Sequence, residues 1–138
     1  RDVSIEIRTP EVSAVVSPVA AIKAVRVKLV ELQREISKGK RIILDGRDIG
    51  TCVLPNADLK IYLTASADER ANRRAKEMRE KGYDVDVEEI KKDIIARDEA
   101  DMQREVSPLK KADDAILLDT TKMTIDEVLQ EIIRLANA

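Results

Sequence analysis

The chain has 138 residues, of which 43% are hydrophobic and 38% charged, with a formal net charge of −2. This composition is typical of one soluble globular domain, and it argues against a disordered chain, a nucleic-acid-binding surface or a membrane-spanning segment. The single cysteine and the absence of histidine exclude an internal disulfide, make a zinc site improbable and predict a reducing, cytoplasmic location.

The first element that the sequence predicts is a helix over residues 17–39. Ser17 is a good N-cap, Pro18 suits the first helical position, and Gly39 can end the helix. One apolar face follows helical spacing and is formed by Ile22, Val25, Leu29, Leu32 and Ile36.

Three short apolar segments predict buried strands. They are "RIILD" (41–45), "LKIYLTA" (59–65) and "AILLD" (115–119). Strands that alternate with helices favour parallel βα units, and therefore an α/β fold in which ligands gather beyond the carboxyl ends of the strands.

Three further helices are predicted at 67–81, 87–104 and 125–137. Each begins with a capping-box signal, a short polar residue followed three positions later by a glutamate. These pairs are Ser66 with Glu69, Asp86 with Glu89, and Thr124 with Glu127.

The stretch "DGRDIG" (45–50) follows the strand predicted at 41–45. Its glycines allow the backbone to approach a ligand closely, and the planar guanidinium of Arg47 suits phosphate. The alternative is an ordinary turn that ends a strand and carries a surface ion pair.

The helix at 87–104 places Arg97, Asp101 and Arg104 at i, i+4 and i+7, on one side of the helix. Two arginines that frame a carboxylate suit a ligand carrying both phosphate and hydroxyl groups. The same spacing also fits a plain intrahelical salt-bridge ladder.

The helix at 67–81 is rich in basic residues, and its apolar positions are mostly Ala71, Ala75 and Met78. So thin an apolar stripe predicts a helix that is loosely attached to the core, as a mobile cover would be. The alternative is a solvated basic helix with no such role.

Several long strings resemble bacterial cytidylate (CMP) kinases, which are P-loop nucleoside monophosphate kinases. The most specific are "DGRDIGT" (45–51) and "RDEADMQREVSPLKKADDA" (97–115), and "ERANRRAKEMREKG" (69–82) also matches. The matching strings run along the whole chain in the order and spacing of the family. The resemblance implies a P-loop NTPase-type parallel sheet with flanking helices, and transfer of a phosphoryl group from ATP to CMP or dCMP with Mg²⁺.

The resemblance also implies roles for individual residues. Those expected to read the cytosine edge are Ser17, Arg26 and Asp48. The monophosphate would be held by Arg47 and Arg104, and the sugar by Arg97 and Asp101, with Arg97 also near the phosphate. The cationic groups expected to be catalytic are therefore Arg47, Arg97 and Arg104.

For the ATP side, Arg73 and Arg74 match arginines of the family's lid, which would span residues 66–85. Asp45 resembles an acidic residue that supports the water shell of magnesium, without binding the metal directly. In this family catalysis rests on neutralising charge and positioning the reacting groups.

One family feature is missing from this sequence, the glycine-rich P-loop with its strand and first helix. We therefore expect residues 1–138 to form a partial cytidylate kinase domain, with 1–16 as the remnant of the segment that covers the monophosphate. The absent strand would lie between 41–45 and 59–65. The chain alone is expected to be inactive and to need either the P-loop segment as a partner or a second copy that completes the sheet.

Two other functions stay open. The chain can be a non-catalytic fragment that binds a nucleotide or a partner, or part of a kinase for another pyrimidine monophosphate such as UMP. No nucleic-acid or membrane partner is expected.

Overall fold

The computed structural model describes residues 1–4 and 6–138. Residue 5, which belongs to the predicted 1–16 remnant, lies outside the described residues. The described chain groups into two compact units, Arg1–Pro55 with Arg97–Lys110, and Asn56–Ala96 with Lys111–Ala138. We call them unit 1 and unit 2.

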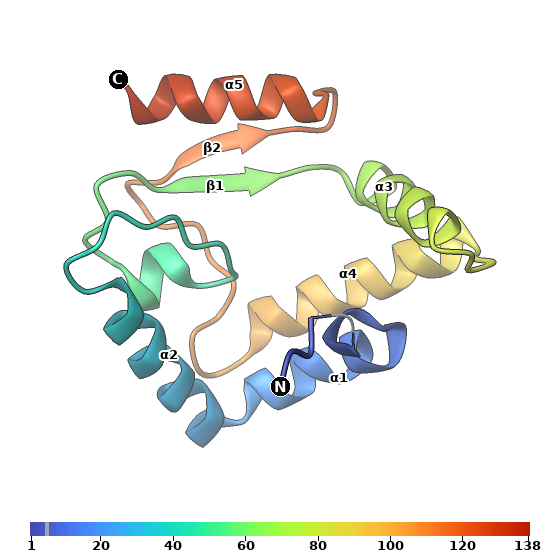
Figure 1. Cartoon of the computed structure of the whole chain (residues 1–138), viewed down its shortest axis with the longest axis horizontal. Coiled ribbons are helices and arrows are strands. Elements are labelled where there is room, and N and C mark those ends of the chain that lie inside the picture. The colour runs from blue at the N-terminus through green and yellow to red at the C-terminus, as the bar shows by residue number, and fades with distance from the viewer. Residues whose placement is uncertain (5) are drawn as a thin grey trace. The chain divides into compact units, whose positions relative to one another are not determined.

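Unit 1 begins with a short 3-10 turn, η1 (Glu6–Arg8), followed by two helices, α1 (Pro10–Ala21) and α2 (Lys23–Ser37). A π-helical turn, η2 (Ile49–Val53), contacts α2. The end of α4 (Val87–Gln103) completes the unit (Figure 1).

The predicted single helix over 17–39 is wrong at its beginning. Thr9 is the N-cap of α1 and accepts a hydrogen bond from the Val12 N–H at 3.4 Å, with a proline as the first helical residue. Pro18 lies inside α1, and the chain breaks at Ile22, where ψ is 116°. The predicted end is confirmed within two residues, because Gly39 follows α2 with φ of +65°.

The predicted strand at 41–45 is also wrong. These residues have no regular secondary structure, and Ile43 is 94% exposed. A strand needs a neighbour that supplies ladder hydrogen bonds, and no described backbone group of another strand pairs with this segment.

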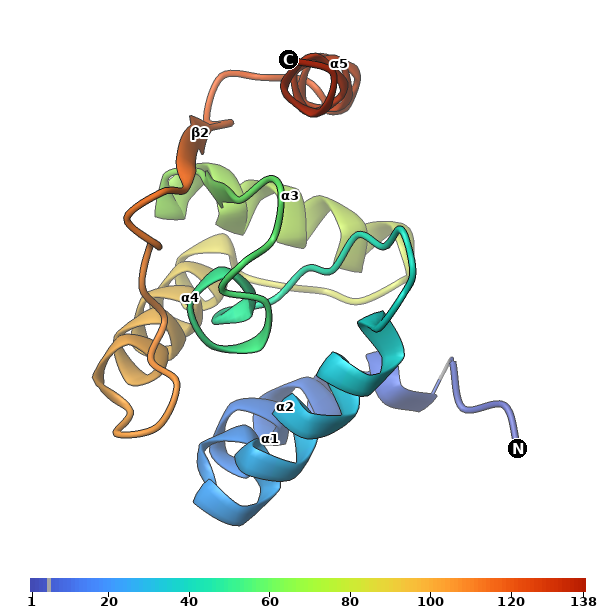
Figure 2. The same ribbon diagram turned by 90° about the vertical axis from the view of Figure 1, so that its left-hand side faces the viewer.

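Unit 2 contains the two strands that confirm the α/β prediction. β1 (Ile61–Thr64) and β2 (Ile116–Asp119) are parallel, in a register that pairs Ile61 with Ile116 and Thr64 with Asp119. α3 (Ala67–Glu80) follows β1, and α5 (Ile125–Ala136) follows β2 and runs back in the opposite direction (Figures 1 and 2). Their bounds, and those of α4, agree with the predicted helices within one residue.

The capping signals are confirmed in different degrees. Thr124 and Glu127 form a complete reciprocal capping box at α5. Ser66 accepts a hydrogen bond from the Glu69 N–H at 3.2 Å. Asp86 instead accepts from the N–H of Glu88, at 2.8 Å.

The attachment of α3 is closer than its thin apolar stripe predicted. Ala71 and Ala75 are 0% and 1% exposed, because small side chains let the helix approach its neighbours. An ion pair of 2.6 Å between Asp68 and Lys91 ties α3 to α4 within unit 2. Within the described part of the chain, no helix has the length and apolar character needed to cross a bilayer.

Candidate functional site

A pocket of about 160 Å³ lies within unit 1. Its walls come from α1, α2, the turn before η2 and the end of α4. All seven residues that were predicted to bind substrate line it, namely Ser17, Arg26, Arg47, Asp48, Arg97, Asp101 and Arg104. Segments far apart in the sequence therefore present charged side chains to one cavity.

Asp101 is the centre of the first charge cluster, and the residue is 3% exposed. Its Oδ1 accepts a hydrogen bond of 2.8 Å from the Ser17 hydroxyl. Three guanidinium groups surround the carboxylate at nitrogen–oxygen distances of 3.4, 4.0 and 3.6 Å, from Arg47, Arg97 and Arg104. These distances indicate shared electrostatic attraction more than fully formed hydrogen bonds.

Asp48 is the centre of the second cluster and is 2% exposed. Its Oδ1 pairs with Nη2 of Arg26, and Nη2 of Arg104 lies 4.0 Å away. Arg104 therefore connects the two carboxylates. Its Nε also donates to the Ser107 carbonyl, which fixes the guanidinium at the end of α4.

The turn that carries Asp48 is held by backbone and side-chain contacts. The Asp48 carbonyl accepts from the N–H groups of Cys52 and Val53, at 2.8 and 3.2 Å. Arg34, on α2, donates to the carbonyls of both residues. A Cβ on Gly46 would lie 2.9 Å from the Ile49 side chain, so a larger residue there would push this side chain aside.

The site keeps unused hydrogen-bonding capacity. Among the described residues, five buried side-chain atoms lack a hydrogen-bond partner: Arg26 Nε, Gln33 Oε1, Asp48 Oδ2, Arg97 Nε and Arg104 Nη2. All five belong to residues that line the pocket. Leaving such an atom unpaired costs about 1–3 kcal/mol, so their concentration here indicates a polar ligand.

The charge of the site favours an anion. The pocket-lining side chains include four arginines and two aspartates, so two positive charges remain uncompensated. A phosphate monoester carries about −1.5 to −2 charges at neutral pH and accepts several hydrogen bonds. The pocket therefore has the charge and the donors to hold such a group.

Comparison with known proteins assigns the chain to a family. The family model described as cytidylate kinase matches residues 1–138. The chain belongs to the cytidylate kinase family.

Curated relatives agree with this assignment. The chain is 54% identical over 134 residues to the cytidylate kinase of Caldicellulosiruptor bescii, a match that covers 97% of this chain and 59% of that protein. It is 58% identical over 132 residues to that of Desulforamulus reducens, covering 96% and 60%. The cytidylate kinase of Lactobacillus johnsonii is 56% identical over 132 residues, covering 96% and 57%. The chain therefore spans about three fifths of the length of the curated relatives it matches.

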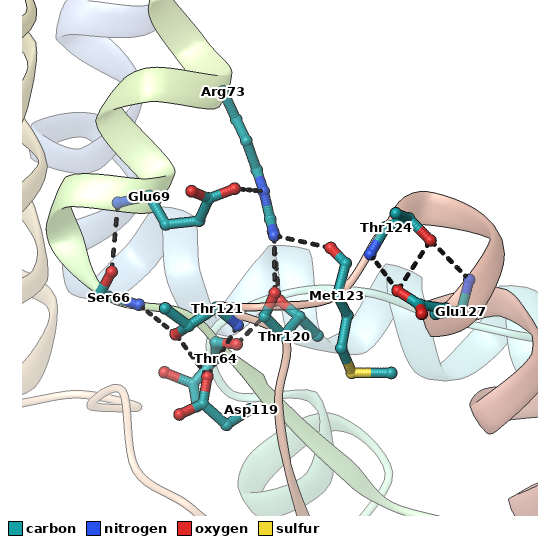
Figure 3. Close-up of polar contacts among 10 residues, drawn as sticks. All are labelled: Thr64, Ser66, Glu69, Arg73, Asp119, Thr120, Thr121, Met123, Thr124 and Glu127. Carbon is teal, nitrogen blue, oxygen red and sulfur yellow. Dashed lines mark hydrogen bonds and ion pairs between the residues drawn. The ribbon is translucent and has the colours of Figure 1, made fainter.

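The two arginines predicted to contact ATP lie in unit 2, and their contacts differ. Figure 3 shows those of Arg73. Arg73 donates to the Thr120 hydroxyl at 3.2 Å, to the Thr120 carbonyl at 2.7 Å and to the Met123 carbonyl at 3.3 Å. Its Nε also pairs with Glu69 at 2.8 Å. Arg74 pairs with Glu77 at 3.2 Å. The hydrogen-bonding capacity of Arg73 is thus largely committed within unit 2.

The polar network around Arg73 continues at the carboxyl ends of the strands (Figure 3). The Thr120 hydroxyl donates to the Thr64 carbonyl at 3.0 Å, and Thr120 is 3% exposed. Hydrogen bonds from the Thr121 side chain and backbone hold the pKa of Asp119 below its usual value. The network therefore links β1, β2 and α3.

Asp45, the residue predicted to support magnesium, is exposed in the segment before the pocket. No group of three or more metal-ligating side chains occurs among residues 1–4 and 6–138. The role of Asp45 toward magnesium stays a prediction from the family resemblance.

Sequence reasoning missed two side chains at the site. Gln33 lines the pocket, and Arg34 braces the turn that follows Asp48. Gln33 lies seven residues after Arg26, two helical turns further along the same face, and this spacing is the signal that was available. No local pattern indicates the role of Arg34, because its partners are backbone carbonyls.

Proposed function

We propose that the protein carrying this chain transfers a phosphoryl group from ATP to CMP or dCMP, giving the diphosphate and ADP. Family membership supports this reaction. The observation that carries the proposal for this chain is the convergence of four arginines on two buried aspartates around one pocket of unit 1. Unit 1 would hold the nucleoside monophosphate.

The residues of the pocket divide by the part of the nucleotide that each would contact. Arg47 and Arg104 would hold the monophosphate, and Arg97 and Asp101 would contact the sugar, with Arg97 also near the phosphate. Ser17, Arg26 and Asp48 would read the cytosine edge. The unpaired Oδ2 of Asp48 accepts hydrogen bonds and therefore suits the exocyclic amino group of cytosine.

The chemical contribution of this chain is positioning and charge neutralisation. Phosphoryl transfer places charge on oxygens, and a fixed set of guanidinium groups stabilises that charge without a covalent intermediate. Arg47, Arg97 and Arg104 would supply this stabilisation around the acceptor phosphate. Of these three side chains Arg104 is the buried one, with 7% exposed, so water screens its attraction least.

On the donor side, ATP is the expected phosphate source and Arg73 and Arg74 are the candidate lid arginines, within 66–85. Arg74 is the better placed of the two, because Arg73 would first have to exchange its bonds to Thr120 and Met123. The single carboxylate of Asp45 would accept hydrogen bonds from the water shell of a nucleotide-bound Mg²⁺, and the phosphates would supply the direct ligands.

The P-loop has no counterpart in this sequence. We propose that turnover requires a P-loop segment and that residues 1–138 alone bind the monophosphate without transferring phosphate. The free thiol of Cys52 fits the reducing cytoplasm that we infer as the location.

The test is a coupled ADP-release assay on the full protein, with CMP, dCMP and UMP as acceptors. We expect turnover with CMP and dCMP and much weaker turnover with UMP. Arg104→Met should abolish turnover with CMP, whereas the exposed Arg41→Met, matched in size and charge, should not change it. CMP binding without turnover would support the non-catalytic alternative, and a preference for UMP would support a kinase for another pyrimidine monophosphate.

A further inference from the structure

We propose that Gln33 is a further specificity-determining residue, whose side-chain oxygen accepts a hydrogen bond from the exocyclic amino group of a cytosine base. The inference rests on the proposed function, because it takes the pocket of unit 1 as the nucleotide site. It adds a neutral side chain to a set that consisted of charged residues and one serine.

The position of Gln33 is the first support. The residue lies on α2, seven positions after Arg26, so both side chains lie on the same face of the helix. Gln33 and Arg26 line the pocket together with Asp48. Arg26 is assigned to the base, and the helix face that it shares with Gln33 is the reason for assigning Gln33 to the base as well.

The unused acceptor is the second support. Gln33 Oε1 is buried and has no hydrogen-bond partner. Among the described residues, the other buried side-chain atoms without a hydrogen-bond partner belong to candidate ligand-binding residues, namely Arg26, Asp48, Arg97 and Arg104. We explain the unpaired oxygen of Gln33 by a ligand that is bound there in the working protein. A glutamine with only a packing role would pair its oxygen within the protein.

Cytosine and uracil differ in the hydrogen-bonding group that an amide oxygen would meet. Cytosine presents an amino donor at the position where uracil presents a carbonyl acceptor. An amide oxygen in the protein pairs with the first and repels the second. A glutamine amide can also rotate to present its N–H₂ group to the uracil carbonyl, so the preference that Gln33 adds is smaller than that of a side chain that only accepts.

Two substitutions test separately the polar group of Gln33 and its ability to switch from acceptor to donor. Gln33→Met keeps the length of the side chain and removes the polar group, so the preference for CMP over UMP should fall by about three- to tenfold. Gln33→Glu keeps an acceptor that cannot become a donor by rotating, so the preference for CMP over UMP should rise. The matched control is Gln130→Met, at an exposed position of α5, and it should change neither affinity.

The measurement is calorimetric titration of the full protein with CMP, UMP and inorganic phosphate. Phosphate affinity should be unchanged in Gln33→Met, because the inference places Gln33 at the base. Gln33→Glu adds a negative charge to the pocket and should lower the affinity for all three ligands, so its readout is the ratio of CMP to UMP affinity. In Gln33→Met, equal losses for CMP, UMP and phosphate would show a structural role and overturn the inference, as would an unchanged preference. If the Met variant does not fold, Gln33→Asn withdraws the amide by one methylene and should lower the same preference; an unchanged preference in this variant overturns the inference.

The two proposals fail in distinguishable ways. If the unsubstituted protein binds neither CMP nor UMP, the proposed function is wrong. If it prefers CMP and keeps that preference in Gln33→Met, the proposed function stands and the inference about Gln33 is wrong.

Discussion

The pocket arginines of unit 1 and Arg73 of unit 2 differ in how far their hydrogen-bond donors are already used. In unit 1, four arginines share two buried aspartates, and one buried nitrogen in each of Arg26, Arg97 and Arg104 lacks a hydrogen-bond partner. In unit 2, the guanidinium of Arg73 bonds to Thr120, Met123 and a glutamate of its own helix (Figure 3). The number of arginines in a segment is therefore a weaker indication of ligand binding than the hydrogen bonds that these arginines already make within the protein.

The comparison separates a structural arginine from a ligand-binding one on physical grounds. A guanidinium group has five N–H donors in a fixed fork. When backbone carbonyls occupy these donors, as at Arg73, binding a phosphate requires breaking existing bonds. When the donors are buried and unpaired, a phosphate recovers the free energy that burial cost.

The largest effect is expected at Asp101, the centre of the unit 1 cluster. Asp101→Asn removes the charge that balances three arginines, so the free energy of unfolding should fall by about 3 kcal/mol in denaturant titrations. The affinity for inorganic phosphate should rise, because the pocket gains positive charge. Glu99→Gln removes the same charge from an exposed position of α4 and should change neither quantity much. A lower phosphate affinity in Asp101→Asn would contradict the assigned charge balance.

A smaller effect is expected at Arg73, in unit 2. Arg73→Met leaves the buried Thr120 carbonyl without this donor, so the free energy of unfolding should fall by about 1–3 kcal/mol. Calorimetry should show unchanged CMP affinity, because the pocket proposed to bind CMP lies in unit 1. Arg74→Met is the matched control on the same helix and should cost less stability. Equal stability losses in the two variants would remove the distinction between the two arginines.

Local signals were sufficient for most elements of this fold. The helices that begin after Ser66 and Thr124 have caps that the sequence shows, and the two paired strands are short apolar runs. The beginning of α1 was not predictable, because Thr9–Pro10 and Ser17–Pro18 are equally good helix starts. The strand expected at 41–45 failed for another reason, since a strand depends on a partner that local sequence does not contain.

The same division applies to the site. Charge patterns and the family resemblance marked all seven residues that line the pocket with ionic or hydroxyl groups. Gln33 has no charge to mark it, and it became visible only through its buried, unpaired oxygen. The engagement of Arg73 depends on carbonyls about fifty residues further along the chain, at Thr120 and Met123. Such partners follow from the tertiary structure alone.

The smallest effect is the pH dependence of stability that arises from the capping box of α5. It tests whether the polar groups of unit 2 stabilise the fold and do not bind the nucleotide. Hydrogen bonds from the backbone and side chain of Thr124 lower the pKa of Glu127 from its ordinary value of 4.5. A carboxyl group whose pKa is lower in the folded state contributes stability above its unfolded pKa and loses it as the pH falls through the folded value. The free energy of unfolding should therefore decline as the pH drops below about 4.5.

Glu127→Gln is the variant that isolates this contribution. Glutamine keeps an oxygen that accepts from the Thr124 N–H but does not titrate there, so the difference in unfolding free energy between the original chain and the variant should shrink as the pH falls below 4.5. Urea titrations between about pH 3 and 6 measure this difference, and Glu105→Gln, at an exposed loop position, controls for the removal of one charge. A difference that stays constant with pH would mean that Glu127 caps α5 by hydrogen bonding alone, without a contribution from its charge. The proposed CMP site contains no part of this network. The affinity for CMP should therefore be the same in the original protein and in Glu127→Gln at each pH between about 3 and 6.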